Sequence, residues 1–396
     1  MSVRRGVAAN GDSEDIGTWS GIPHYLLRAG LKCGFLQFGL DLRLTNPDWK
    51  RRVWHAGRML RGEQPRGFQY SAAFLKGLGE KAVQECERLN LQEVVSHYQL
   101  LPARRLNEHS IATSFYIDTT LQDLFTTHEM HSWLNGRVVE EAIKRETEGY
   151  QSASRVVTMA RWVQCSLFEV YGVAGEHVHT VLPGANLPED VVEQFLIEHG
   201  RHICPDRFTS ERPFRIGFTG KDATRKGLPR LVKAVAILNR MGIPTVVVVI
   251  GNLPKEYESD PHVRSAGFID KFKDVNRFME TLMSCDLGCA PSHEEPMGIA
   301  PLEYLRLGIP VLCTAAGGLI DVCEAAGPAS VLLDKEASAE EIASQLEMLA
   351  KDVALLQNMR DAAWARKEHF RWERTVRDLE QIWAKPLIPD RIHDAH

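Results

Sequence analysis

Apolar and polar positions alternate along the chain so that predicted strands and helices follow one another from end to end. Short apolar runs predict strands at 3–9, 36–42, 110–118 and 154–160, and the clearest amphipathic helix covers 69–89. Such a succession is typical of a mostly parallel sheet with helices on both faces.

The same succession starts again after a polar stretch. Strand 214–220 opens a second run, which continues with the valine-rich strand 244–251 and the helix 274–285. We therefore predict an α/β fold of two Rossmann-like, doubly wound domains that face each other across a cleft. The predicted bounds are 1–190 for the first domain, 191–212 for a linker, 213–370 for the second domain and 371–396 for a closing helix.

Composition narrows the class of protein. With 396 residues, 44% hydrophobic and 25% charged, the chain is globular and long enough for two domains. A net charge of −5 argues against a nucleic-acid partner, because nucleic-acid-binding domains are usually basic. Eight cysteines without zinc-site spacing, and an N-terminus without a signal-peptide pattern, predict a reduced, cytoplasmic protein.

The densest candidate chemistry lies in residues 285–318, CDLGCAPSHEEPMGIAPLEYLRLGIPVLCTAAGG. This pattern predicts a strand, a polar loop, a helix from about Ile299, a Gly-Ile-Pro stop and a second strand. Gly298 allows the backbone to approach a ligand closely. The amides of Met297, Gly298 and Ile299 precede or begin the helix, where unpaired N–H groups and the helix dipole favour a phosphate.

Glu295 and Glu303 are eight residues apart across this helix start. Eight helical residues rise about 12 Å, which is roughly the reach from a donor sugar, past a diphosphate, to a ribose. We expect Glu295 to accept hydrogen bonds from sugar hydroxyls and Glu303 from ribose hydroxyls, since charge-assisted bonds are the stronger ones. Taken as bare spacing, the pair favours two solvated glutamates; the strand, Pro-Ser, Gly298 and Gly-Ile-Pro around it favour a binding site.

A cationic loop precedes the helix of the second domain that follows strand 214–220. Lys221, Arg225 and Lys226 lie in it, next to Gly220. Two cations at this position are suited to neutralising a departing diphosphate. The loop lacks both the P-loop order and the dinucleotide-binding glycine fingerprint. A solvated turn is the structural alternative.

Together these residues resemble the retaining GT-B glycosyltransferases of family 4, the glycosyl transferases group 1. The matching motifs are Gly220-Lys221, Lys226-Gly227, Pro291-Ser292, Glu295-Pro296-Met297-Gly298, Glu303 and Gly308-Ile309-Pro310-Val311. The first basic position is more often Arg in the family. Lys221 therefore keeps the charge but loses the bidentate fork.

The first domain resembles the family less closely. In WSGIPHYLL, Gly21 matches the second glycine of the family's phosphate-contacting loop, and Ser20 replaces the first. The family's histidine near the reacting sugar has no clean equivalent, so His97 and Asp118, each expected at a strand end, are the candidates. The helix 371–396 resembles the one that packs back on the first domain.

The resemblance implies a metal-independent, retaining transfer of a sugar from a nucleotide-diphosphate sugar, UDP or GDP type, to a hydroxyl acceptor, without a cofactor, in cell-surface glycan or polysaccharide synthesis. No D-x-D motif is present to hold a metal. The predicted catalytic residues are Lys226, Lys221, Glu295, Asp118 and His97. The predicted donor-binding residues are Gly21, Gly220, Met297, Gly298, Ile299 and Glu303.

Residues 48–66, DWKRRVWHAGRMLRGEQPR, mix basic residues with two tryptophans. Basic amphipathic stretches bind anionic membrane surfaces, so a lipid-linked acceptor and a peripheral contact with the inner face of the plasma membrane fit this pattern. A solvated basic helix is the alternative.

Two further functions remain compatible with the sequence. A GT-B epimerase would act on a free sugar nucleotide without an acceptor. A non-catalytic sugar-nucleotide-binding subunit would use the same pocket, and the substituted Ser20 is compatible with it.

Overall fold

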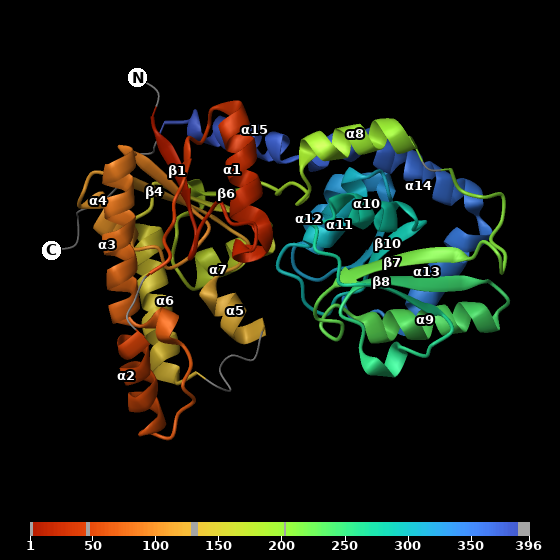
Figure 1. Ribbon diagram of the computed structural model, residues 1–396, viewed down its shortest axis with the longest axis horizontal. Coiled ribbons are helices and arrows are strands. Elements are labelled where there is room, and N and C mark those ends of the chain that lie inside the picture. Colours follow the sequence, from red (N-terminus) through yellow and green to blue (C-terminus); the bar gives the residue numbers. More distant parts are fainter. Residues whose placement is uncertain (1–2, 45–47, 128–133, 202, 387–396) are drawn as a thin grey trace. The chain divides into compact units, whose positions relative to one another are not determined.

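The structure is a computed structural model that describes residues 3–44, 48–127, 134–201 and 203–386. It divides into two compact units. The first unit is Met1–Leu182 with Thr375–His396, and the second is Pro183–Arg374. Each unit is built on one six-stranded sheet (Figure 1).

The first unit carries a sheet in the order β2-β1-β3-β4-β5-β6, with all neighbouring strands parallel. Its strands are β1 Arg5–Ala8, β2 Phe38–Gly39, β3 Glu93–Ser96, β4 Ala112–Ile117, β5 Arg155–Thr158 and β6 Val178–Thr180. Its helices are α1 Ile22–Cys33, α2 Asp48–Met59, α3 Ala72–Leu89, α4 Ala103–Asn107, α5 Leu121–Thr127, α6 Gly136–Gln151 and α7 Trp162–Glu169.

Local sequence sets the limits of these helices, as α3 illustrates. The Ser71 side chain accepts a hydrogen bond from the Phe74 amide and caps the start, and Asn90 adopts a left-handed conformation at the end. The buried residues between them recur at helical spacing and pack into the core of the sheet: Leu75, Leu78, Ala82, Val83 and Cys86.

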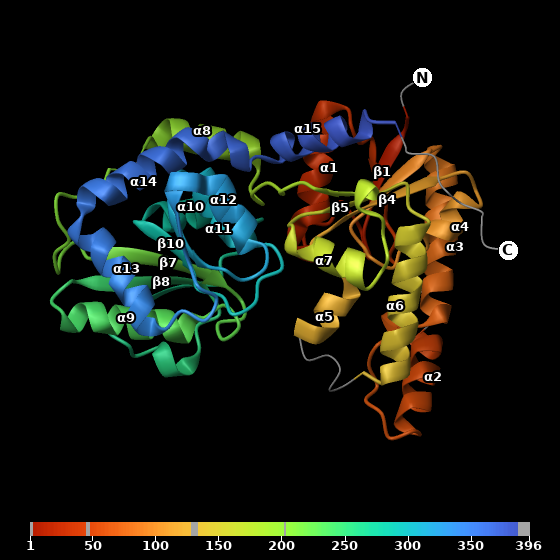
Figure 2. The same cartoon turned by 180° about the vertical axis from the view of Figure 1, so that it is seen from behind.

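The second unit has the strand order β12-β11-β10-β7-β8-β9, again entirely parallel. Its strands are β7 Phe214–Gly220, β8 Thr245–Gly251, β9 Val263–Gly267, β10 Leu287–Ala290, β11 Val311–Thr314 and β12 Ser330–Leu333. Its helices are α8 Glu189–His199, α9 Leu228–Arg240, α10 Val275–Met283, α11 Ile299–Arg306, α12 Leu319–Ala326, α13 Ala339–Lys351 and α14 Val353–Arg366. Figures 1 and 2 show α9 on one side of this sheet and α10 and α11 on the other.

The predicted fold class is confirmed, because both sheets are parallel and flanked by helices. Two predicted stretches differ in detail. The polar stretch expected as a linker begins inside α8, whose Val192, Phe195 and Leu196 are buried. The long C-terminal helical stretch is interrupted at Asp352, which ends α13 and caps α14 by accepting from the Leu355 amide.

The last helix, α15 Trp372–Trp383, ends in the first unit. The Trp383 indole donates a 2.7 Å hydrogen bond to Glu93. Its ring also lies under the Arg155 guanidinium at 5.1 Å and meets the Phe35 ring edge-on. These contacts hold the end of α15 against residues of the first sheet.

Candidate functional site

The strand order of the second sheet reverses between β7 and β10, which are neighbours although α9, β8, β9 and α10 separate them in the chain. Open α/β sheets bind ligands at the carboxyl ends of strands at such a switch point. The loops that follow these two strands hold Lys221 and Lys226 on one side, and Ser292 and Glu295 on the other. This is where we locate the candidate site.

Glycine makes the close packing of these two loops possible. Gly227 has φ 78°, and a Cβ there would lie 1.8 Å from the Pro291 carbonyl oxygen. A Cβ on Gly220 would lie 2.4 Å from the Lys226 side chain. The stem of Lys226 therefore crosses directly over the end of β7.

Lys226 and Glu295 form an ion pair across the two loops. The ammonium donates to the Glu295 carboxylate at 2.8 Å, and the Glu295 side chain is only 9% exposed. The Ser292 hydroxyl donates to the same carboxylate oxygen at 3.4 Å. Sequence reasoning assigned Lys226 to the phosphates and Glu295 to the sugar. In this structure the two side chains neutralise each other.

Arg225 has a different role from its neighbour. Its guanidinium donates to the Glu294 carbonyl at 2.5 Å, and its own carbonyl accepts from the His293 amide at 2.9 Å. These contacts tie the two loops together. Lys221 is exposed, and its ammonium lies 5.6 Å from the centre of the Phe268 ring.

The start of α11 is open in the way the sequence predicts. Gly298 is its N-cap with φ 91°, and no side chain caps the helix. Gly318 packs against the backbone of Met297, where a Cβ would lie 2.7 Å from the Met297 carbonyl oxygen. Behind the helix start lies a cavity of about 10 Å³, lined by Lys226, Ser292 and Ala300 among others. This space fits about one water molecule.

Glu303 lies one turn into α11 and is only 2% exposed. Its carboxylate forms a short ion pair with Lys271, which sequence reasoning did not identify. Burial raises the pKa of Glu303, and the positive charge of Lys271 opposes that rise. Lys271 follows β9 in a polar segment, GFIDKFKD, that carries no spacing signal.

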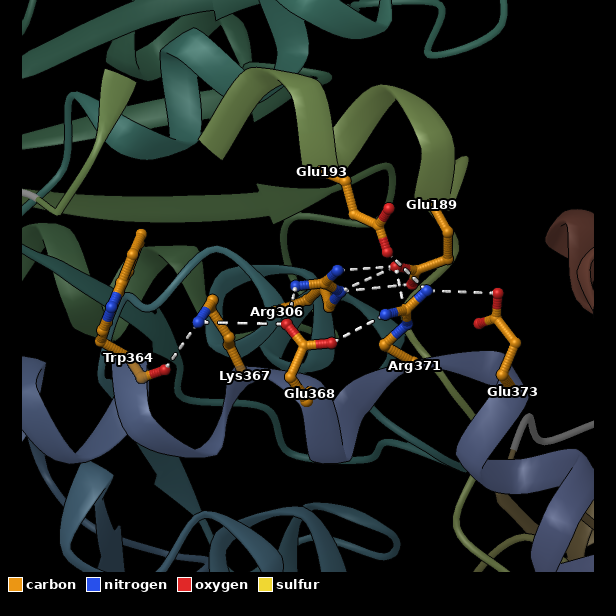
Figure 3. Close-up of polar contacts among 8 residues, drawn as sticks. All are labelled: Glu189, Glu193, Arg306, Trp364, Lys367, Glu368, Arg371 and Glu373. Atoms are coloured by element: carbon orange, nitrogen blue, oxygen red, sulfur yellow. Dashed lines mark hydrogen bonds and ion pairs between the residues drawn. The ribbon is translucent and has the colours of Figure 1, made fainter. Parts of the chain in front are cut away.

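The carboxyl end of α11 is held by a cluster of charges around the buried Arg306 (Figure 3). Arg306 is fully buried and donates to Glu189 at 2.7 Å and to Glu368 at 3.4 Å. Arg371 lies 3.2 Å from Glu189 and 2.7 Å from Glu193. The cluster fixes the end of the candidate binding helix against α8 and the turn before α15.

In the first unit, His97 and Asp118 directly follow the neighbouring strands β3 and β4. His97 is buried, and its Nδ1 lies 2.9 Å from the Tyr116 carbonyl. Its Nε2 has no hydrogen-bond partner among the residues that the structure describes. Asp118 is half-buried. The two predicted residues therefore lie at the same edge of the first sheet.

The loop containing Gly21 is strained. Trp19, Ser20 and Gly21 are all left-handed, with φ of 48°, 58° and 88°. Only Gly adopts this region without a steric penalty. The Trp19 ring meets the His97 ring edge-on at 5.5 Å. Trp19 was not predicted, because nothing in the sequence marks a tryptophan as left-handed.

The described residues bear on two further kinds of site, a metal centre and a membrane-spanning helix. No group of three or more His, Cys, Asp or Glu side chains within these ranges is arranged to hold a metal ion. None of the helices described combines the length and the hydropathy needed to cross a bilayer.

Comparison with known proteins identifies a family match in the second unit and relatives along most of the chain. Residues 205–366 match the family described as glycosyl transferases group 1. The chain is 25% identical over 316 residues to a D-inositol 3-phosphate glycosyltransferase of Paenarthrobacter aurescens (strain TC1). The aligned region covers 74% of each of the two chains.

Solved structures share the fold of the whole chain. A sucrose-phosphate synthase from Thermosynechococcus elongatus superposes with a TM-score of 0.68 at 16% identity, covering 97% of this chain and 98% of that one. Anabaena HepE in complex with UDP and glucose superposes with a TM-score of 0.62 at 14% identity, covering 97% and 100%. At these identities the likeness concerns the fold, and that fold is GT-B.

Proposed function

We propose that this chain, which has the GT-B fold and whose residues 205–366 match glycosyl transferases group 1, transfers a sugar from a nucleotide-diphosphate sugar to a hydroxyl acceptor with retention of configuration. The observation that carries this proposal is the pairing of Lys226 with Glu295 beside the open start of α11. A cation, a carboxylate and a helix start that no side chain caps, all at one switch point, match the phosphate and hydroxyl groups of such a donor.

In the proposed reaction, Lys226 and Lys221 bind the diphosphate together with the amides near Gly298. Glu295 accepts hydrogen bonds from the sugar, and Glu303 accepts them from the ribose. The bond between the anomeric carbon and the phosphate oxygen breaks, and the acceptor oxygen bonds to the same face of that carbon. The departing phosphate oxygen takes the acceptor's proton, while the lysines stabilise its growing negative charge.

First-unit residues complete the proposal. We assign Asp118 to orienting the acceptor hydroxyl. We assign His97 to the reacting sugar and the loop at Gly21 to donor binding. The Nε2 of His97, buried and without a partner among the described residues, supports such a role, since an unsatisfied buried polar atom calls for an explanation and a ligand contact is one. The positive charges of Lys221 and Lys226 support a reaction that needs no metal.

The test is a screen of UDP-, GDP- and ADP-sugars with the purified protein. We expect slow release of nucleoside diphosphate from one of them without an acceptor, faster release with one, equal rates in EDTA, and a product whose anomeric configuration by NMR equals that of the donor. Binding without any release would favour the non-catalytic subunit. Conversion of the free sugar nucleotide into its epimer would favour an epimerase.

We also propose that the acceptor is lipid-linked and is met at the cytoplasmic face of the membrane. Trp49, Val53 and Leu60 are 57%, 63% and 89% exposed and recur at spacings that place them along one side of α2 and its extension. Exposed Lys50 and Arg52 flank this apolar stripe. A basic amphipathic helix of this kind is suited to an anionic lipid surface.

Sedimentation with vesicles containing anionic lipid tests this part of the proposal. The wild type should pellet with anionic vesicles and remain in solution with neutral ones. The double variant Trp49→Ser/Leu60→Ser should stay in the supernatant. Ile197→Ser, which removes an apolar residue of α8 that is 77% exposed, should pellet like the wild type. Full recovery of the wild type in the supernatant would remove the membrane proposal.

A further inference from the structure

Among the residues that the structure describes, Lys271 is the cation that pairs with the buried carboxylate of Glu303. It lies in the segment between β9 and α10, and its ammonium pairs with Glu303 Oε1. The Asn186 carbonyl lies 3.4 Å from the same ammonium, and the Phe278 ring centre lies 5.2 Å away. Three contacts therefore hold the side chain of Lys271.

A carboxylate buried this deeply needs a partner to stay charged. Burial in a low-dielectric environment favours the neutral acid, and a neighbouring cation favours the anion. Among the described groups, Lys271 approaches Glu303 from the β9–α10 segment, and Lys226 acts on it from a greater distance across the loop after β7. Lys226 is itself paired with Glu295. Tyr304 is the next residue after Glu303 in α11, and the Tyr304 hydroxyl forms a hydrogen bond with the Thr219 hydroxyl.

We propose that Lys271 is a positioning residue for the nucleoside half of the donor, holding Glu303 ionised and oriented so that its remaining lone pairs accept both ribose hydroxyls. This proposal rests on the function proposed above. A carboxylate has about four lone-pair sites, and one bond to Lys271 leaves sites for a vicinal diol. A protonated Glu303 would lose part of that accepting capacity and all of its charge.

Loss of the Glu303 charge is measurable as a lower affinity for the nucleoside diphosphate and as a lower selectivity for ribose over 2′-deoxyribose. Hydrogen bonds to a charged group contribute more than bonds to a neutral one, and losing the charge corresponds to roughly a tenfold or larger loss of affinity. The same charge favours a ribonucleotide over its 2′-deoxy analogue. A variant without Lys271 should therefore bind the nucleoside diphosphate more weakly and discriminate less between the two sugars.

The experiment is calorimetry with UDP, GDP and ADP, and with the 2′-deoxy form of whichever binds, between pH 6 and pH 9. The variants are Lys271→Met, Lys271→Arg and Lys273→Met. Lys273 is two residues away, 85% exposed and paired only at 3.6 Å with Asp270, so it is the matched control. Each affinity is divided by that of the wild type at the same pH, which cancels the titration of the nucleotide itself.

We expect Lys271→Met to bind about tenfold or more weakly at pH 7 and to recover toward pH 9, because Glu303 loses its proton as the pH rises. Lys271→Arg and Lys273→Met should follow the wild type. In a Glu303→Gln background, Lys271→Met should change the affinity little further. Thermal melting establishes that each variant is folded.

Equal or tighter binding by Lys271→Met would overturn the proposal, and so would a loss of affinity by the same factor at every pH. Either result would leave the proposed function intact, provided that the wild type binds one nucleotide. A wild type that binds none of the three would contradict the proposed function itself, and this inference with it.

Discussion

Glu295→Gln separates the two halves of the proposed donor site. The substitution keeps the size of the side chain and removes its charge. In the structure that charge is paired with Lys226 at 2.8 Å, and the two side chains are 9% and 17% exposed. We expect the variant to bind the nucleoside diphosphate as well as the wild type or better, and to bind the intact sugar nucleotide much less well.

The magnitude follows from the geometry of the pair. Two charges at this separation attract by about 6 kcal/mol at an effective dielectric constant of about 20. Desolvation and side-chain ordering offset most of this, which leaves a net pairing energy of about 1 kcal/mol. A diphosphate that binds Lys226 no longer has to break that pair in the variant, so its affinity rises by up to about fivefold.

The sugar contributes in the opposite direction. Hydrogen bonds from hydroxyls to a charged acceptor contribute about 1.5–3 kcal/mol. Their loss lowers the affinity for the intact donor by about 10- to 100-fold or more. The ratio of the donor affinity to the diphosphate affinity should therefore fall by at least tenfold.

Calorimetry without an acceptor measures both affinities, with Glu294→Gln as the neighbouring control. The Glu294 carbonyl rather than its side chain contacts Arg225, so this control should resemble the wild type. If Glu295→Gln weakens the diphosphate alone as much as the intact donor, the assignment of Glu295 to the sugar is wrong.

Substitutions of Lys226, Arg306 and Glu146 test the site, the packing of α11 and the pH dependence of stability. Lys226→Met should lower kcat by about 100-fold or more while the fold melts normally, as measured by nucleotide release and circular dichroism; normal turnover would contradict its assignment to the leaving group. Arg306→Met should lower the free energy of unfolding by about 3 kcal/mol, because it leaves Glu189 short of a partner, and adding Glu189→Met should restore part of it in urea titrations. Glu146 is a fully buried residue of α6. Burial raises its pKa to about 8, so the folded chain holds a proton that the unfolded chain has lost. Stability should fall by about 2 kcal/mol between pH 6 and pH 8, and Glu146→Gln should flatten that dependence.

Local sequence preference was sufficient where a segment is buried and regular. The strand 214–220 was predicted with the bounds that the structure gives, and 244–251 differs from β8 by one residue, because both are apolar, partly β-branched runs bounded by Pro and Gly. The start of α11 was readable for a similar reason, since Gly298 and Pro301 mark it directly.

Pairings between distant residues could not be read in this way. Lys271 and Glu303 are 32 positions apart, and Arg306 and Glu189 are 117 apart. Each partner alone looks like one of many surface charges. Only the fold brings them together and buries them, so the charge state of the candidate site depends on contacts that no local pattern specifies.

The loop at Gly21 shows the same limit at the level of the backbone. The glycine was identified from a resemblance, yet the two residues before it, Trp19 and Ser20, are left-handed as well. Each such residue costs about 1–2 kcal/mol, and such strain persists only where the surroundings impose it. Trp19 lies against His97, whose Nε2 is unpaired among the described residues. Backbone strain and an unsatisfied buried nitrogen both lower stability. They coincide at the carboxyl ends of the parallel strands, where open α/β sheets bind ligands. Their coincidence supports the binding role proposed for this edge, since packing alone would favour glycine at position 20 and an apolar residue at position 97.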